Sequence, residues 1–254
     1  MRFEPEVLHG SPWLRVFASG ATPPRRRLMC CPYAGGGASL FRAWVEHLPP
    51  DVELLAIQYP GREERLMEPP FTRLIELTTA LTRDIGPLLA DRPYAIFGHS
   101  LGALVAFELT RELRGQGARL PTQLFLSGAP DPRDNTFRGK GRHLWPDTAF
   151  VEELRRIGGT PAELLGNGEL MSLLLPTLKA DFALVDTYEY LEDVPLEVPL
   201  NIFGGLEDRE IDRASLEAWT RETRAAFRLS MFSGDHFFLN GQASRLCELI
   251  GQAL

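Results

Sequence analysis

The sequence predicts a single α/β domain built on a mostly parallel β-sheet that is flanked by helices. Short apolar runs followed by turn residues recur along the chain, and several are continuous, as expected of strands covered on both faces. Helical patterns lie between these runs, which favours parallel strands with crossover helices. A length of 254 residues with 44% hydrophobic residues suits one domain over 1–254. The runs predicted as strands are 13–18, 28–31, 54–59, 94–97, 124–126, 200–203 and 227–232.

Two segments between these runs have the apolar spacing of amphipathic helices. In the first, leucines and isoleucines recur at intervals of three and four over Leu74–Leu88, with a disturbance at Gly86-Pro87. The second covers Leu104–Leu113 and is expected to stop at Gly115 and Gly117. Each helix follows one predicted strand and precedes another, as crossover connections do.

One stretch, about 131–194, interrupts the alternation because it contains no convincing strand. Asp147 is expected to cap a first helix there, and Thr160–Glu163 has the form of a capping box with proline at the first helical position. A third helix is expected from Glu169 toward Tyr188, bent at Pro176. The many apolar residues of this insertion fit plain packing on the core. They also fit a helical lid that lines an acyl-binding chamber.

Charge and hydropathy narrow the classes of function. The 27 basic and 34 acidic residues give a net charge of −7, which argues against broad nucleic-acid or membrane binding. No apolar run approaches the roughly 18 residues of a membrane helix. The acidic start, broken by Pro5 and Pro12, is unlike a signal peptide, and the three cysteines are expected to be reduced and buried. We therefore expect a cytoplasmic protein, and a monomer.

The sharpest motif is Gly98-His99-Ser100-Leu101-Gly102, between a predicted strand and a predicted helix. A G-x-S-x-G sequence in that context describes a nucleophile elbow, in which a strained turn lifts the serine hydroxyl to the carboxyl edge of the sheet. Side chains at Gly98 or Gly102 are expected to collide with the neighbouring strand or helix. Ser100 is therefore the predicted nucleophile.

A serine hydroxyl needs a base within hydrogen-bond reach. Of the five histidines, His236 follows a late strand and so lies at the carboxyl edge, where a base could approach Ser100. We predict that His236 is the base. The remaining four, at positions 9, 47, 99 and 143, are expected to be solvated or packed.

The base needs a carboxylate that fixes its tautomer and stabilises the imidazolium. Asp208 follows the strand directly before that of His236, in a glycine turn, and is the favoured acid. Asp131 also ends a strand and competes with it, and Glu207 is a weaker alternative. All three respect the chain order serine, acid, histidine.

An oxyanion formed on the substrate needs hydrogen-bond donors, and two backbone N–H groups are predicted to supply them. One belongs to Leu101, the residue after the nucleophile, and the other to Ala34, in the glycine-rich loop after an early strand. Gly35–Gly37 lacks the lysine and Ser/Thr of a phosphate loop. No metal-ligand or dinucleotide motif is present, so we expect acyl transfer to water or another acceptor without a cofactor.

With these motifs in place, the chain resembles the type II thioesterases, free-standing editing enzymes of polyketide and nonribosomal peptide assembly lines, in the α/β-hydrolase superfamily. The resemblance implies an α/β-hydrolase fold and hydrolysis of stalled or aberrant acyl groups from the phosphopantetheinyl arms of acyl and peptidyl carrier proteins. It also supports Ser100, Asp208 and His236 as the triad. Relatives often have histidine where Tyr33 stands, which alters the pocket mouth and not the backbone donor. The segments that carry the resemblance are 32–37, 58–63, 98–102, 158–161, 174–176, 179–182, 203–208 and 234–239.

Two further expectations concern charged residues. Arg62 is expected to pair with Glu63 or Glu64 in a structural turn. A basic cluster entering the insertion and a second one at Arg25–Arg27 are either solvated loops or a surface for an acidic carrier protein. The first cluster consists of Arg133, Arg138, Lys140, Arg142 and His143.

Other functions stay open at this point. A fatty-acid-chain-terminating thioesterase or a carboxylesterase would use the same fold and the same nucleophile. A catalytically silent α/β-hydrolase acting as a binding module is disfavoured, because such proteins usually lose a member of the triad.

Overall fold

A seven-stranded sheet runs through the residues that the computed structural model describes, which are 10–17, 22–134 and 139–254. The strand order is β1-β3-β2-β4-β5-β6-β7; β1 is antiparallel to β3, and all other neighbours are parallel. The seven strands predicted from the sequence are confirmed, with shifts of one or two residues at their ends. The strands are β1 (Leu14–Phe17), β2 (Arg26–Cys31), β3 (Val52–Ile57), β4 (Tyr94–His99), β5 (Leu124–Ser127), β6 (Leu200–Gly205) and β7 (Phe227–Phe232).

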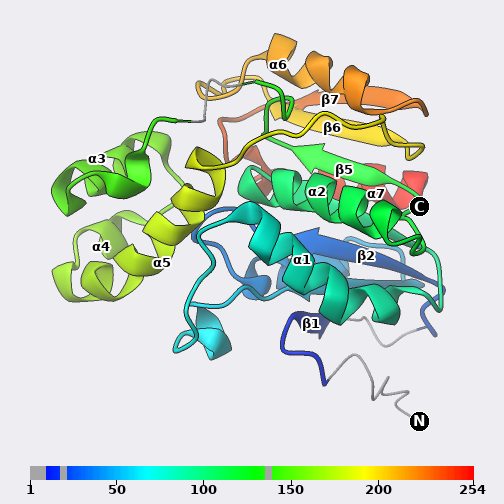
Figure 1. Ribbon diagram of the computed structural model, residues 1–254, viewed down its shortest axis with the longest axis horizontal. Coiled ribbons are helices and arrows are strands. Elements are labelled where there is room, and N and C mark those ends of the chain that lie inside the picture. The colour runs from blue at the N-terminus through cyan, green and yellow to red at the C-terminus, as the bar shows by residue number, and fades with distance from the viewer. Residues whose placement is uncertain (1–9, 18–21, 135–138) are drawn as a thin grey trace.

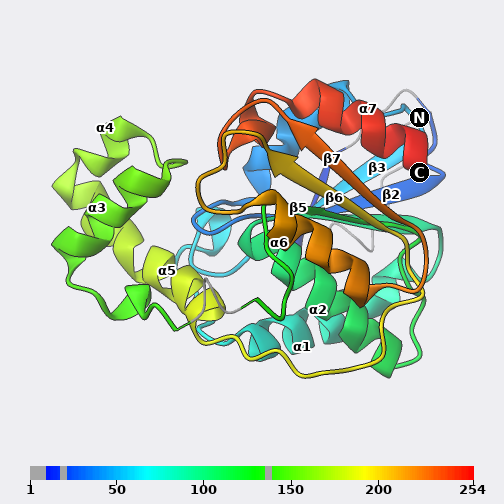
Figure 2. The ribbon, with the colours of Figure 1, turned by 90° about the horizontal axis from the view of Figure 1, so that it is seen from above.

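Helices cover both faces of the sheet (Figure 2). On one face lie α1 (Leu74–Ile85), α2 (Leu101–Gly115) and the short α6 (Arg213–Glu217). On the other lie α7 (Ala243–Ala253) and a 3₁₀ helix over Ala38–Glu46. The strands β3, β4, β5 and β6 are buried along their whole length, which explains why most of their residues are apolar.

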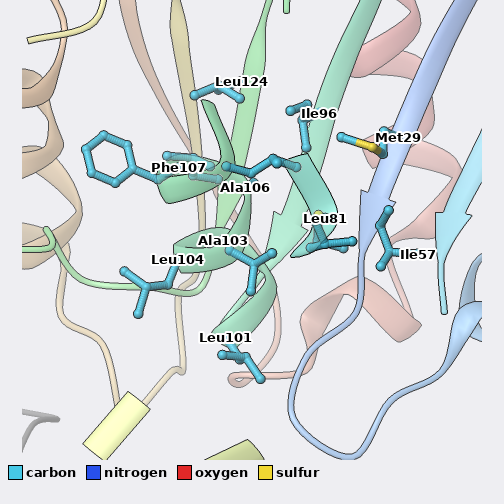
Figure 3. Packing of buried hydrophobic residues seen from close by; sticks show 14 of the residues in the cluster. Met29, Ile57, Leu81, Ile96, Leu101, Ala103, Leu104, Ala106, Phe107 and Leu124 are labelled. Atoms are coloured by element: carbon cyan, nitrogen blue, oxygen red, sulfur yellow. The ribbon is translucent and has the colours of Figure 1, made fainter. Parts of the chain in front are cut away.

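The larger of the two main hydrophobic clusters joins α1 and α2 to the sheet (Figure 3). Ala103 and Phe107 of α2 lie there with Met29 of β2 and Ile96 of β4, and all four side chains are at most 1% exposed. Small residues on α2 let the helix approach the sheet closely, and Phe107 fills the space beside it. This packing fixes the start of α2, and therefore Ser100, relative to the strand ends.

Three helices come from the insertion predicted over 131–194: α3 (Asp147–Ile157), α4 (Ala162–Leu165) and α5 (Gly168–Asp186). They lie at the end of the sheet to which the strand arrows point (Figure 1) and share a small hydrophobic cluster of their own. Pro176 lies inside α5. Although α5 is the longest helix, no helix in the described part of the chain is both long and apolar enough to cross a membrane.

The helix starts within this insertion correct two expectations. Pro146 and Pro161 occupy the N-cap positions of α3 and α4, and neither helix has a side-chain cap. Asp147 is already helical and pairs with Lys179 of α5, and Thr160 precedes the cap. A proline fixes φ near −65° in an extended conformation, so each helix can start directly after it without a polar cap. A side-chain cap is present at α5, where Asn167 accepts from the N–H of Leu170.

Candidate active site

Ser100 occupies a strained turn between β4 and α2, with φ 53° and ψ −118°. In the described residues, Glu63 is the only other non-glycine residue with positive φ. Such a conformation costs on the order of 1–3 kcal/mol and persists only where the surroundings impose it. Here the Ser100 N–H donates to the carbonyl oxygen of Ser127 at 2.8 Å, which ties the turn to β5. The strand–turn–helix context predicted for Ser100 is therefore present.

The two glycines of the motif are required by close backbone contacts. A Cβ atom on Gly98 would lie 2.0 Å from the carbonyl oxygen of Gly102. A Cβ atom on Gly102 would lie 2.1 Å from the carbonyl oxygen of Cys31, at the end of β2. The expected collisions are confirmed, because neither backbone atom can move without displacing a strand or the first turn of α2.

His236 lies in the loop after β7 and contacts Asp208, which follows β6. Its Nδ1 atom is 2.9 Å from Oδ2 of Asp208, and both side chains are buried. The other carboxylate oxygen of Asp208 accepts N–H groups from Glu210 and Ile211, at 2.8 and 3.2 Å. A carboxylate oxygen that accepts from Nδ1–H selects the His236 tautomer whose lone pair is on Nε2. His236 is therefore arranged as a base.

The two competing acids contact other groups, although Asp131 lines the same cavity as Ser100 and His236. Oδ1 of Asp131 accepts from the N–H of Arg133 at 2.6 Å, and its Oδ2 is buried with no partner among the described residues. Glu207 accepts from the N–H of Gly234 and so holds the turn before His236. The structure brings Asp208 to His236, and neither Asp131 nor Glu207.

The glycine-rich loop after β2 forms a tight turn over residues 33–36. The N–H of Gly36 donates to the carbonyl oxygen of Tyr33 at 2.9 Å, and Gly35 has φ +80°. This combination is typical of a type II turn, in which only glycine takes the third position easily. In the described part of the chain, the N–H groups of Ala34 and Leu101 make no hydrogen bond within the protein. Both are therefore available as donors.

A cavity unites these groups. It is lined by Ser100, His236, Ala34 and Leu101 on the sheet side. Apolar side chains of α3 and α5 line the rest of the cavity: Leu154, Ile157, Phe182 and Val185. The cavity is thus lined by a strained serine, by the histidine of a histidine–carboxylate pair, by the residues of two free N–H groups and by apolar side chains. These are the components of an acyl-transfer site.

Comparison with known proteins places the chain in a family. The family model described as "Thioesterase domain" matches residues 26–254. The chain belongs to the thioesterase family. It is 42% identical to the gramicidin S biosynthesis protein GrsT of Aneurinibacillus migulanus, over 94% of this chain and 93% of that protein.

Solved structures agree with this assignment. The RedJ thioesterase from the prodiginine pathway of Streptomyces coelicolor is 36% identical, with a TM-score of 0.85 over 92% of this chain and 94% of that one. The type II thioesterase YbtT from the yersiniabactin NRPS/PKS pathway is 32% identical, with a TM-score of 0.81 over 92% and 94%. The resemblance to type II thioesterases and the α/β-hydrolase fold predicted from the sequence are therefore confirmed.

His99 has a clearer place in this thioesterase than the sequence indicated. Its ring is fully buried, with Nδ1 2.9 Å from Oγ of Ser127 and the ring centroid 5.1 Å from that of His236. Burial lowers the pKa of His99 well below its usual value, so the ring is neutral at physiological pH. His99 packs behind the site and is not arranged as a base, in agreement with the prediction that it is a packed residue.

The expected partner of Arg62 is wrong. Arg62 pairs with Asp181 of α5, which lies 119 positions away in the sequence. Glu63 instead accepts from the N–H and hydroxyl of Ser39, and Glu64 pairs with Arg15. Local spacing suggested a neighbouring acid, but the buried guanidinium faces the inserted helix.

The basic clusters are largely neutralised by internal partners. Arg142 is buried against Asp186, which also contacts Nδ1 of His143 at 3.0 Å. Arg133 pairs with the buried Glu222. Arg138 lies outside the described residues. In the second cluster, Arg27 is buried and pairs with Glu53 and Asp91, and Arg26 pairs with Asp51. Most of these basic side chains are therefore paired within the protein, which weakens their interpretation as a surface for an acidic carrier protein.

Proposed function

We propose that this thioesterase hydrolyses acyl thioesters on the phosphopantetheinyl arms of carrier proteins through an acyl-Ser100 intermediate. Ser100, Asp208 and His236 form the catalytic triad, and the N–H groups of Ala34 and Leu101 form the oxyanion hole. The observation that carries the proposal is that strained Ser100 and His236 line one cavity, and that His236 is already hydrogen-bonded to Asp208.

Acylation begins when Nε2 of His236 takes the hydroxyl proton of Ser100 as Oγ attacks the thioester carbonyl. The negative charge that forms on the carbonyl oxygen is stabilised by the N–H groups of Ala34 and Leu101. The carbon–sulfur bond then breaks, and the imidazolium of His236 returns its proton to the departing thiolate. The products of this half-reaction are an acyl ester on Ser100 and a free pantetheine thiol.

Deacylation repeats the sequence with water as the nucleophile. His236 takes a proton from water, the hydroxide attacks the acyl ester, and the same two N–H groups stabilise the second oxyanion. Collapse of this intermediate returns the proton to Oγ of Ser100 and releases the carboxylic acid. Asp208 supports both halves because its carboxylate stabilises the imidazolium.

The cysteines near the site do not compete with Ser100 as nucleophiles. Cys30 and Cys31 end β2 and are fully buried, as is Cys247 of α7. Burial raises the pKa of Cys31 to about 12, and that of Cys247 to about 12 as well. These groups are therefore thiols at neutral pH, and the thiolate is the reactive form.

The inserted helices act in this proposal as a lid over 131–194 that forms the acyl chamber. Leu154 and Ile157 of α3 and Phe182 and Val185 of α5 supply its apolar wall. Because a thiolate leaves easily, hydrolysis needs little recognition of the acyl group beyond fit. The size of the chamber, set by α3 and α5, would then select the acyl chains.

Carrier-bound substrates are inferred from the relatives. YbtT is described as a type II thioesterase of an NRPS/PKS pathway, and GrsT as a gramicidin S biosynthesis protein. Assembly lines of this kind hold their intermediates as thioesters on acyl or peptidyl carrier proteins. We propose that this chain removes stalled or aberrant acyl groups there, acting as a monomer.

The test is intact-mass spectrometry of carrier proteins loaded with acyl groups from acetyl to long or branched chains. We expect wild-type enzyme to return each accepted carrier to its holo mass, and Ser100→Ala to leave it acylated. Cleavage of simple esters by an enzyme that deacylates no carrier would replace the proposal with a carboxylesterase. A preference confined to long fatty acyl chains would indicate a chain-terminating thioesterase.

A further inference from the structure

A buried ion pair joins two segments beside the site. Nη1 and Nη2 of Arg62 each lie 2.7 Å from one carboxylate oxygen of Asp181, and the two side chains are 8% and 2% exposed. Arg62 precedes a short 3₁₀ helix over Glu63–Arg65, and Asp181 lies in α5. A two-pronged contact of this kind fixes the relative orientation of both groups as well as their distance.

Both members of the pair also hold the turn that carries Ala34. Oδ2 of Asp181 accepts the N–H of Gly35 at 2.7 Å. Nη1 of Arg62 donates to the carbonyl oxygen of Gly36 at 3.1 Å. The N–H of Gly35 belongs to the peptide between residues 34 and 35, at the centre of the turn. Type I and type II turns differ by the flip of this central peptide. Asp181 therefore holds this peptide in the orientation that φ +80° at Gly35 requires.

The same stretch of α5 is seated against both loops. A Cβ atom on Gly35 would lie 2.6 Å from Cδ2 of Leu178, so the helix touches the turn directly. Thr177 donates its hydroxyl to the carbonyl oxygen of Gly61 at 2.8 Å. Residues 177–181 thus lie against the loop that holds Arg62 and the loop that holds Ala34. Any shift of this part of α5 would move the turn with it.

A contribution to folding stability does not by itself explain why Arg62 and Asp181 form a buried ion pair. Transfer of two charges into the interior costs several kcal/mol each, and replacement of a buried ion pair by apolar residues is often neutral or stabilising. What apolar residues could not supply is an acceptor for the N–H of Gly35 and a donor for the carbonyl of Gly36. The charges are therefore best explained by the backbone groups that they orient.

We propose that Arg62 and Asp181 are positioning residues that set the oxyanion hole by locking the 33–36 turn to α5. The proposal rests on the proposed function, because it assigns the Ala34 N–H to the oxyanion. Neither side chain touches the reacting atoms. Their effect is on the transition state, where the Ala34 N–H must meet a charge that the ground-state carbonyl does not carry.

The test compares Asp181→Asn with Glu53→Gln. Glu53 forms a similar buried pair, 2.7 Å from Nε of Arg27 with both side chains 2% exposed, but it lies outside the cavity. On an acyl-N-acetylcysteamine thioester, we expect Asp181→Asn to lower kcat about 10- to 100-fold with KM within about twofold of wild type. Glu53→Gln should lower the melting temperature about as much as Asp181→Asn does, and its kcat should equal that of the wild type.

A second measurement separates positioning from general damage. An alkylboronic acid forms a tetrahedral adduct with an active serine, and we expect its inhibition constant to rise in Asp181→Asn by about the factor by which kcat falls. Arg62→Lys keeps the positive charge but cannot donate two parallel hydrogen bonds to Asp181. It should show the same pattern, and it replaces Asp181→Asn in the test if that variant does not fold. Equal kcat in Asp181→Asn and Glu53→Gln, or a loss confined to KM, would overturn the inference. If wild type hydrolyses no thioester and binds no boronic acid, the proposed function itself fails.

Discussion

At the scale of single residues, the site combines a strained serine with a histidine that is already hydrogen-bonded to a carboxylate. Ser100 holds φ 53° because Gly98 and Gly102 leave room for the turn and because its N–H is bonded to Ser127. His236 is oriented before substrate arrives, since Asp208 is itself fixed by two N–H groups. Little reorganisation is then needed when the imidazolium forms, which is how preorganised sites lower barriers.

Asp208→Asn tests this arrangement. The amide keeps the size of the side chain but can donate to Nδ1 of His236, which favours the wrong tautomer and removes the charge. We expect kcat to fall about 10⁴-fold while KM and the melting temperature change little. Steady-state kinetics on a soluble thioester give the comparison. Glu207→Gln is the matched control, and a loss as large in that variant would contradict the assignment of the acid.

Asp131 gives a prediction about pH and stability. Burial raises the pKa of Asp131, and its Oδ2 has no partner among the described residues. An acid whose pKa is raised by folding destabilises the protein as pH rises from about 4, the unfolded value, through the folded value. Asp131→Asn keeps an oxygen for the Arg133 N–H, so it should be about 1 kcal/mol more stable than wild type at pH 8.

The pH-dependent part of the stability difference should vanish below about pH 3, where Asp131 is protonated in both the folded and the unfolded state. Urea denaturation at several pH values measures it. A variant that is less stable than wild type at pH 8 would show that the carboxylate has a favourable partner instead.

At the scale of elements, the attachment of α2 to the sheet determines the position of Ser100, the proposed nucleophile. Phe107 packs edge-on against Trp219 with ring centroids 5.1 Å apart, and both are buried. The small residues Ala103 and Ala106 bring the start of α2 close to the strands (Figure 3). The elbow therefore depends on packing along the whole helix, and not on the G-x-S-x-G segment alone.

Phe107→Ala should cost about 3–5 kcal/mol of unfolding free energy, because it leaves a cavity in a close-packed core. Ile75→Ala, at a side chain that is 58% exposed on α1, should change it by less than about 0.5 kcal/mol. Urea denaturation followed by circular dichroism compares the two. Equal effects would mean that the α2 contact contributes little to stability.

The elements also show what could be predicted from the sequence and what could not. The strands were predictable because both of their faces are covered, which leaves continuous apolar runs such as 54–57. The pairing of His236 with Asp208 was predictable because chain order and strand ends limit the candidates. The partner of Arg62 was not, because nothing in a local pattern indicates a contact with Asp181, 119 residues away.

At the scale of the whole molecule, one end of the sheet carries the proposed catalytic residues, and α3, α4 and α5 lie at that end (Figure 1). The cavity lies between these two parts, so its reactive wall and its apolar wall come from different segments of the chain. Substitutions in the helical wall should then alter which acyl groups fit and leave the chemical step intact.

Ile157→Trp tests this separation. The residue lines the cavity from α3, and a larger side chain there should reduce the space for the acyl group. We expect at least about a tenfold loss of kcat/KM for long acyl chains and nearly unchanged hydrolysis of acetyl thioesters. Arg155→Trp, on the exposed side of the same helix, is the control. A uniform loss over all chain lengths would contradict a chamber formed by α3.

The central claim, catalysis through an acyl-Ser100 ester, is tested most directly by finding that ester. Stoichiometric enzyme and octanoyl-loaded carrier protein would be mixed, quenched with acid within milliseconds, digested and mapped by mass spectrometry. We predict an octanoyl group on the peptide that contains Ser100, appearing before free octanoate and absent from Ser100→Ala. Undiminished hydrolysis by Ser100→Ala, or an acyl group found on another residue such as Cys31, would contradict the account.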